Sequence, residues 1–274
     1  MCTASWIRRV GGSDPSAELP AAAPRAPRIA PAAGWFLAFN RDESRARPAA
    51  LPPEQHRGGQ GVRFLAPIDP AEGGTWIAVN EFGLALALLN NYQATFEPLA
   101  PAISRGRLVL ALAECSGLAA LEAGLRRAEL ARHRAFHLLV LPPGEPAALF
   151  DWDGRSLGRD DRPEQRLPLI SSGYDLPGVR QRRLETFRRL VLARPGPEEQ
   201  RLREFQASPA PPDAPQPAGA YAVRMSRPDA RTVSQTEVFV EPERVRLRYR
   251  ALPEDPLAPL PDWQRDLSLA RAHP

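Results

Sequence analysis

The chain has 274 residues, of which 43% are hydrophobic and 25% are charged. That length is enough for one large domain or two small ones with a hydrophobic core. No run of about 18 apolar residues is present, so we expect no transmembrane helix. The first residues also lack the apolar segment of a secretory signal peptide. We therefore expect a cytoplasmic protein.

The charge balance is basic, with a formal net charge of +4. A basic chain is compatible with nucleic-acid binding. Here, however, all 36 basic residues are arginine, and they alternate with 32 acidic residues along the chain instead of forming one patch. The abundance of arginine, proline and alanine is typical of GC-rich codon usage. We expect solvated charged faces and no nucleic-acid partner.

Cysteine and histidine are scarce. Two cysteines do not make a disulfide framework, and no metal-ligand spacing is present. Cys115 lies in the apolar stretch LVLALAEC, which predicts a small core residue. The four histidines are scattered, so we expect them to be structural or exposed: His56, His133, His137 and His273. No metal or cofactor is expected.

The first half of the chain alternates short apolar runs with breaks. Residues 2–8 predict a strand. Residues 11–33 are rich in proline and alanine, which predicts a disordered insertion. Further strands are predicted at 35–39, 62–66, 75–79 and 84–89. Residues 104–130 then predict one or two helices, interrupted near Gly117.

The second half begins with strands predicted at 136–141 and 147–152. Pro177 opens a helix that runs to about Leu192, with Asp175 as its N-cap. A proline-rich loop follows at 207–219. The last predicted strands are 231–240 and 244–250, and residues 253–274 are expected to form a C-terminal tail.

This order of elements predicts the fold class. Strands joined by short loops favour antiparallel sheets, and long helices between them must cover a sheet face. We therefore expect one α+β domain over residues 1–252. Two stacked antiparallel sheets between helix layers would suit the number of strands.

Cys2 is the first candidate for chemistry. If Met1 is removed, Cys2 carries a thiol and a free α-amine on the same carbon. An α-amine with a pKa near 7.7–8 can accept the thiol proton, so the nucleophile brings its own base. Taken alone, Cys2 is a weak signal and is more simply explained as a small residue at the start of a strand.

Two further segments carry polar residues at the ends of apolar strands. In FNRDE, Arg41 could lower the pKa of Cys2, and a carboxylate of this segment, Asp42 or Glu43, could hold or orient its amine. In GGTWIAVNEFGLALALLN, the amide of Asn90 could act as an oxyanion donor at the end of a strand. Each segment by itself could also be a salt-bridged turn or a strand cap.

Together these segments resemble a known family. MCT, FNRDE, GGTWIAVNEFGLALALLN and the late RTVSQTEVFV occur in the order found in the NRDE proteins, the transport and Golgi organisation family. The resemblance covers residues 1–252 apart from the insertion and the 207–219 loop. The family is similar to N-terminal-nucleophile (Ntn) hydrolases, particularly to choloylglycine hydrolases and related acylases, which implies an αββα sandwich.

The resemblance also assigns roles to individual residues. Cys2 matches the nucleophile, Asn90 the oxyanion donor, Arg41 and Asp42 the charged pair after the second strand, and Arg231 a late arginine that faces the nucleophile. Ser171 or Ser172 stands where these hydrolases carry a mid-chain asparagine.

Two functions are compatible with this resemblance. The first is a cysteine Ntn amidohydrolase or acyltransferase that acts on the C–N amide bond of a small molecule. The second is a non-catalytic protein that binds or traffics a hydrophobic ligand, haem or lipid, or that supports secretory organisation. A common fold does not decide between them.

Overall fold

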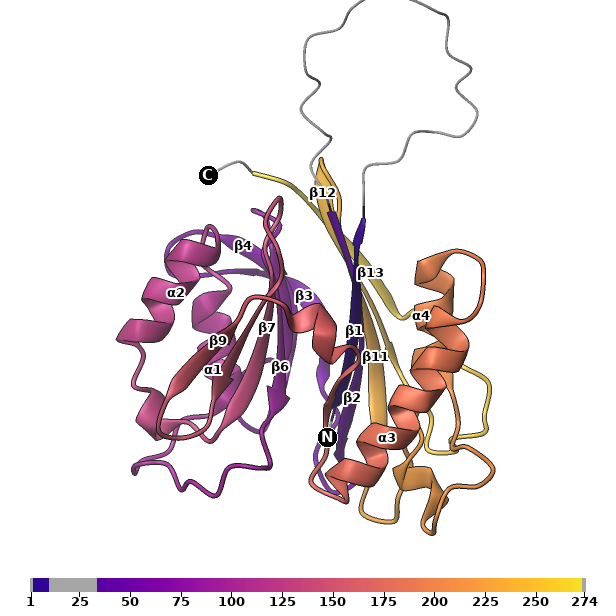
Figure 1. Cartoon of the computed structure of the whole chain (residues 1–274). Helices are drawn as coiled ribbons and strands as arrows, with labels where there is room; N and C mark the ends of the chain where they lie inside the picture. The colour runs from indigo at the N-terminus through magenta and orange to yellow at the C-terminus, as the bar shows by residue number, and fades with distance from the viewer. Residues whose placement is uncertain (1, 10–33, 273–274) are drawn as a thin grey trace, which may run out of the picture.

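Two antiparallel sheets are stacked face to face in the computed structural model, and helices cover both outer faces (Figure 1). The structure describes residues 2–9 and 34–272. Stacked sheets between helix layers are the α+β sandwich that the sequence predicts, and this prediction is confirmed.

The six-stranded sheet has the order β10-β1-β2-β11-β12-β13. Its strands are β1 (Cys2–Arg9), β2 (Gly34–Ser44), β10 (Leu169–Ser171), β11 (Ala230–Val240), β12 (Arg244–Ala251) and β13 (Arg265–Ala270). β1 pairs with β2 along the whole length of β1, from Cys2 opposite Arg41 to Arg9 opposite Gly34. The two strands predicted near the N-terminus are therefore neighbours in one sheet.

The seven-stranded sheet has the order β3-β4-β5-β6-β7-β8-β9 and follows the chain. Its strands are β3 (Leu51–Arg57), β4 (Arg63–Ile68), β5 (Ile77–Asn80), β6 (Ala85–Asn90), β7 (Phe136–Leu141), β8 (Ala148–Trp152) and β9 (Leu157–Asp160). Each strand pairs antiparallel with the next strand along the chain, and most of the connections are short, as antiparallel pairs allow; the exception is the β6–β7 connection, which contains two α-helices.

Helices flank each sheet on the side away from the other (Figure 1). The seven-stranded sheet is covered by α1 (Arg105–Leu112) and α2 (Leu118–Arg127), which are separated at Gly117 as predicted. The six-stranded sheet is covered by α3 (Leu176–Phe187) and α4 (Glu198–Ala207), and α3 continues into a π-helical turn at Arg188–Leu192. Short 3₁₀ turns lie at Leu130–Arg132, Pro163–Arg166 and Ala218–Ala220.

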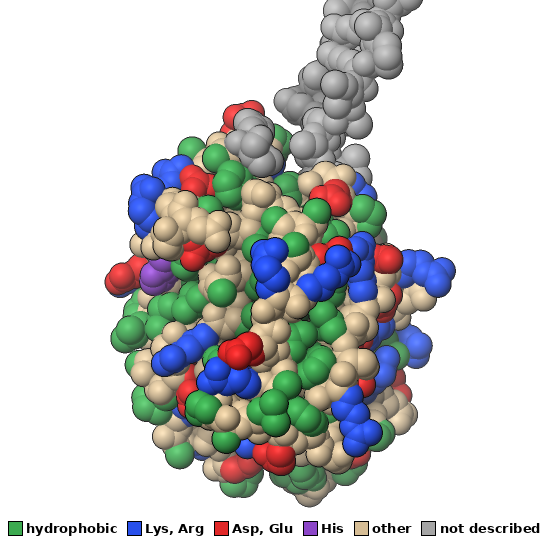
Figure 2. All heavy atoms as spheres, turned by 90° about the vertical axis from the view of Figure 1, so that its left-hand side faces the viewer, with side chains coloured by type: hydrophobic (Ala, Val, Ile, Leu, Met, Phe, Trp, Pro, Cys, Tyr) green, Lys and Arg blue, Asp and Glu red, His purple; other side chains and the backbone are tan. Residues whose placement is uncertain are grey.

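Three apolar layers hold the sandwich together. The main core lies between the sheets and includes Trp6, Leu37, Ile77 and Leu139. A second layer joins the seven-stranded sheet to α1 and α2, and a third joins the six-stranded sheet to α3 and α4. On the face that carries α1 and α2, basic and acidic side chains are interspersed with hydrophobic ones (Figure 2). This arrangement agrees with the solvated charged faces expected from the sequence.

The start of α3 and the turn between β5 and β6 are each stabilised by residues close by in the sequence. The side chain of Asp175 accepts a hydrogen bond from the Gly178 amide and caps α3, as predicted. Gly83 closes the turn between β5 and β6 at a φ of 87°, a conformation that glycine adopts without steric cost. The Asn80 side chain accepts hydrogen bonds from the amides of Phe82 and Leu84 in the same turn.

The C-terminal boundary differs from the prediction. Residues 265–270 form β13, which pairs with β12, and Leu269 of β13 is buried in the core between the sheets. Part of the segment expected to be a tail is thus an edge strand. This strand was not predicted, because its short alternation of polar and apolar residues follows a proline-rich segment. The 11–33 insertion lies outside the described residues. Within those residues, no helix has the length and apolar character needed to span a bilayer.

Candidate active site

Cys2 begins β1, in the six-stranded sheet. Arg41 of β2 lies opposite it on one side, and Ser171 of β10 lies opposite it on the other. The residue is half-buried and packs against the edge of the core between the sheets. The thiol is thus held by two neighbouring strands and is not at a frayed end.

Cys2 lines a cavity of about 170 Å³ together with three other predicted site residues, Arg41, Asp42 and Asn90. Arg41 and Asp42 come from the six-stranded sheet, whereas Asn90 ends β6 in the facing sheet. The cavity therefore lies where the two sheets meet. Trp76 and Arg105, which were not predicted as site residues, also line it.

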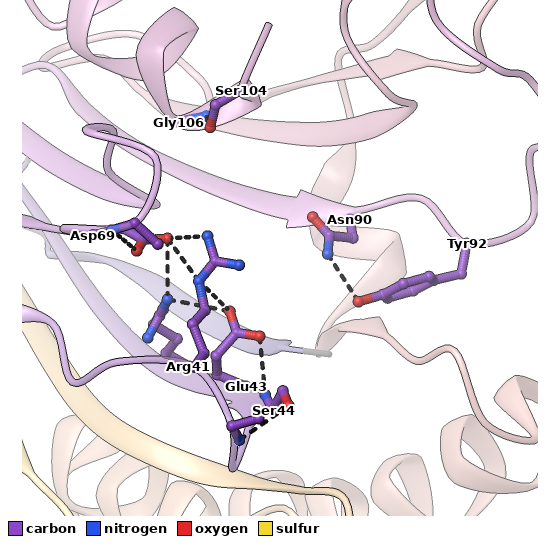
Figure 3. Close-up of polar contacts among 11 residues, drawn as sticks. Arg41, Glu43, Ser44, Asp69, Asn90, Tyr92, Ser104 and Gly106 are labelled. Atoms are coloured by element: carbon purple, nitrogen blue, oxygen red, sulfur yellow. Dashed lines mark hydrogen bonds and ion pairs between the residues drawn. The ribbon is translucent and has the colours of Figure 1, made fainter. Parts of the chain in front are cut away.

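Arg41 belongs to a cluster of ion pairs in the wall of this cavity (Figure 3). It lies 3.1 Å from Glu43 and 3.5 Å from Asp69, and its guanidinium stacks over Trp76 with the centroid of the ring 4.2 Å away. Arg47 lies 2.5 Å from the same Asp69 carboxylate. With two arginines and two carboxylates, the cluster is close to neutral.

Asp42 is buried on the opposite side of β2. It accepts a 2.6 Å hydrogen bond from the hydroxyl of Thr232, and its other carboxylate oxygen lies 3.6 Å from the guanidinium of Arg183. Arg183 is fully buried in α3 and also donates a hydrogen bond to the hydroxyl of Thr3, next to Cys2. A buried ion pair therefore lies directly behind the nucleophile candidate.

Arg183 was not predicted as a site residue, although the sequence contains a signal for it. It lies four residues after Val179 and four before Phe187, so it falls on the buried stripe of α3. An arginine on such a stripe needs a partner inside the protein, because an unpaired buried charge is costly.

Burial raises the pKa of the Cys2 thiol. The negative charge of Asp42 raises this pKa as well, while a hydrogen bond from the Asp42 backbone and the charge of Arg41 lower it. Because the raising effects dominate, the thiol is protonated at neutral pH. A reaction at Cys2 therefore requires a base.

Asn90 lines the cavity and also contacts β10, the strand that pairs with β1 at Cys2. Its side-chain amide donates a 2.8 Å hydrogen bond to the Tyr92 hydroxyl (Figure 3). Its backbone carbonyl accepts a 2.5 Å hydrogen bond from Ser171. Since an amide NH₂ group has two donors, one remains for another acceptor in the cavity.

Arg231, which the resemblance places facing the nucleophile, does not line the cavity that contains Cys2. Its guanidinium donates to the carbonyls of Leu252 and Pro253 and pairs with Glu254 at 3.2 Å. These contacts hold it in a neighbouring cavity of about 270 Å³. The two cavities share Arg41, Glu43 and Arg47 as lining residues.

Comparison with known proteins agrees with this architecture. Residues 30–149 match the family described as Transport and Golgi organisation 2. The family resemblance predicted from the sequence is confirmed. A search of the curated proteins found no match.

One solved structure shows the same fold, and another is similar at a lower score. A mutant of the conjugated bile acid hydrolase from Clostridium perfringens is 11% identical with a TM-score of 0.50, and the match covers 98% of this chain and 92% of that one. Penicillin V acylase from Agrobacterium tumefaciens is 13% identical with a TM-score of 0.43, covering 77% of this chain and 78% of that one. At these identities the likeness concerns the fold alone.

Proposed function

We propose that this protein is a cysteine Ntn amidohydrolase or acyltransferase that cleaves the C–N amide bond of a small molecule. The observation that carries the proposal is the position of Cys2, which opens into a cavity beside Arg41, Asp42 and Asn90. The fold supports the reaction class, because bile acid hydrolase has the same architecture.

The proposed reaction begins after removal of Met1. The α-amine of Cys2 accepts the thiol proton, and the sulfur attacks the carbonyl carbon of the amide. The free N–H of the Asn90 amide donates to the developing oxyanion. When the tetrahedral intermediate collapses, the C–N bond breaks and the ammonium returns its proton to the leaving amine. Water, or an acceptor amine, then attacks the thioester and releases the acyl group.

Asp42 and Arg183 have supporting roles in this proposal. The Asp42 carboxylate orients the α-amine, and it is itself fixed by Thr232 and Arg183. Arg41 is held by Glu43, Asp69 and Trp76 and so forms a rigid wall. Preorganised charges of this kind reduce the reorganisation needed at the transition state.

Binding of a hydrophobic ligand such as haem or lipid is the second function considered. Pockets for such ligands are mostly apolar and about 300–1,000 Å³ in volume. The cavity at Cys2 is smaller, at about 170 Å³, and charged residues line much of it. We therefore favour the hydrolase.

The test combines three measurements on the full-length protein. The intact mass should show that Met1 is absent, and iodoacetamide should label Cys2 in preference to Cys115, whose pKa burial also raises. A panel of N-acyl amides should release amine. Cys2→Ala should abolish this release, and Cys115→Ser should not. A retained Met1, or amine release that survives Cys2→Ala, would contradict the proposal.

A further inference from the structure

Arg105 lines the Cys2 cavity and has unused hydrogen-bond donors. Among residues 2–9 and 34–272, no acidic side chain forms an ion pair with it. Its guanidinium donates a 2.9 Å hydrogen bond to the backbone carbonyl of Ala135. Because a guanidinium carries five N–H donors, others remain for an acceptor in the cavity.

The other guanidiniums near the nucleophile are engaged by carboxylates. In the wall of the cavity, Arg41 lies 3.1 Å from Glu43. Behind the cavity, Arg183 lies 3.6 Å from Asp42. The excess positive charge of the cavity therefore lies on the guanidinium at the start of α1.

The polar residues that the resemblance places around the nucleophile, apart from Asn90, make other contacts. Ser171 donates its hydroxyl hydrogen to the backbone carbonyl of Asn90, and Ser172 donates to the carbonyl of Tyr174. A hydroxyl has one O–H donor, so neither serine can also donate to a substrate in this arrangement. Arg231 lies in the neighbouring cavity. A second donor beside Asn90 must therefore come from another element.

The start of α1 holds Arg105 close to the nucleophile. Arg105 follows the N-cap Ser104, whose hydroxyl accepts from the Gly106 amide. A Cβ on Gly74 would lie 2.5 Å from a Gly106 backbone atom, so the helix start and the turn before β5 are in close contact. Burial lowers the pKa of Arg105, while a charge on Cys2 raises it. The guanidinium is thus within electrostatic range of the nucleophile.

From this geometry we infer that Arg105 is a further catalytic residue, whose guanidinium donates to the oxyanion that forms when Cys2 attacks a carbonyl group. In that step the S–C bond forms and the π electron pair of the carbonyl moves onto its oxygen. Arg105 keeps its proton and stabilises this negative charge beside the amide of Asn90. The inference rests on the proposed function for the attack by Cys2, and it does not depend on which amide is cleaved.

Two thiol reagents distinguish this role from a general effect on Cys2. 4-Nitrophenyl acetate acylates a thiol through a tetrahedral oxyanion and releases 4-nitrophenolate. Iodoacetamide alkylates a thiol by displacement of iodide, without an oxyanion. Both reactions need the thiolate, so the ratio of their rate constants at one pH is independent of the pKa of the thiol. The protein carries Cys115→Ser, and the same protein with Cys2→Ala supplies the background rate.

The expected result is a selective loss of acylation. In Arg105→Gln, the ratio of acylation to alkylation should fall by about 100-fold, the usual effect of removing one oxyanion donor. Arg105→Lys keeps the charge but loses the planar fork of donors, so the ratio should fall by about tenfold. Arg107→Gln, on the exposed side of the same helix, should leave the ratio unchanged.

The outcomes separate this inference from the proposed function. Melting temperatures show which of the two Arg105 variants folds, and an unchanged ratio in a folded variant overturns the inference. It is also overturned if Cys2 of the protein with native Arg105 is alkylated but not acylated. If the ratio falls as expected but no N-acyl amide releases amine, the oxyanion site stands and the hydrolase proposal fails. If amides are cleaved while the ratio is unchanged, the reverse holds.

Discussion

At the scale of single residues, the chemistry of Cys2 depends on charges that lie on both sides of β2. Arg41 contacts the cavity, whereas Asp42 points to the helix layer and pairs with Arg183. A thiolate at Cys2 would stabilise the charge of Arg183, although burial lowers the pKa of this arginine. The electrostatic coupling is reciprocal, so the guanidinium should favour the thiolate.

Replacing Arg183 should therefore change the reactivity of Cys2. In Arg183→Met, alkylation of Cys2 should require a higher pH, because the cation that favours the thiolate is lost while Asp42 remains. Stability should fall by about 3–5 kcal/mol, the cost of leaving one partner of a buried ion pair. The measurements are the pH profile of iodoacetamide labelling and urea denaturation.

The double variant Asp42→Asn/Arg183→Met provides the control for net charge. It should recover part of the lost stability, because neither charge is left buried alone. Arg180→Met, at an exposed position of the same helix, should match the wild type in both measurements. An unchanged pH profile in Arg183→Met would show that Arg183 is purely structural.

At the scale of elements, the contact between the turn before β5 and the start of α1 determines where Arg105 lies. Gly73 adopts a φ of 63°, and Gly74 lies against Gly106. Only residues without a Cβ permit two backbones to approach so closely. The GGTW segment is therefore explained by packing of the helix start against the sheet.

Gly74→Ala should destabilise the protein by about 1–3 kcal/mol, the usual cost of overpacking. The new Cβ would meet backbone atoms of Gly106 and Arg107, which cannot rotate away. Gly59→Ala is the matched control, since a Cβ there meets nothing within 4 Å. It should be neutral or slightly stabilising. Equal effects of the two substitutions in urea denaturation would contradict this explanation.

At the scale of the whole molecule, the candidate site exists only because the two sheets are stacked. The six-stranded sheet supplies Cys2, Arg41 and Asp42, and the facing sheet and its helix supply Asn90 and Arg105. The paired strands β1 and β2 contribute residues both to the core between the sheets and to the candidate site. Arg9 and Gly34, at the two ends of the 10–33 segment, are already opposite each other in this pair.

Replacing residues 11–33 by a short glycine-containing turn should leave the fold intact. The flanking strand ends are in register, so a tight turn can join them. A shorter loop also costs less closure entropy, by about 1–2 kcal/mol for this change in length. The melting temperature should therefore be unchanged or slightly higher. A marked drop would show that the replaced segment contributes to the folded core.

Features set by residues close together in the sequence were predicted more completely than features set by contacts between distant residues. Alternating apolar runs, Gly117 and Asp175 are signals within a few residues, and they predicted most strands and helices of the sandwich. β13 was missed, because an edge strand of mixed polarity has a weak periodicity. The family resemblance predicted the fold and brought Cys2, Arg41, Asp42 and Asn90 into one hypothesis.

The layered fold follows from the order and periodicity of the residues, since burial of periodic apolar faces leaves few arrangements of these elements. Which charges share a cavity depends on how the two sheets and their helices pack in three dimensions. This packing separates Arg231 from Cys2, because the carbonyls of Leu252 and Pro253 hold that guanidinium elsewhere. It also adds Arg183 and Arg105 to the candidate site. Electrostatic partners are chosen by distance in space, and the residues concerned come from strands and helices far apart in the chain.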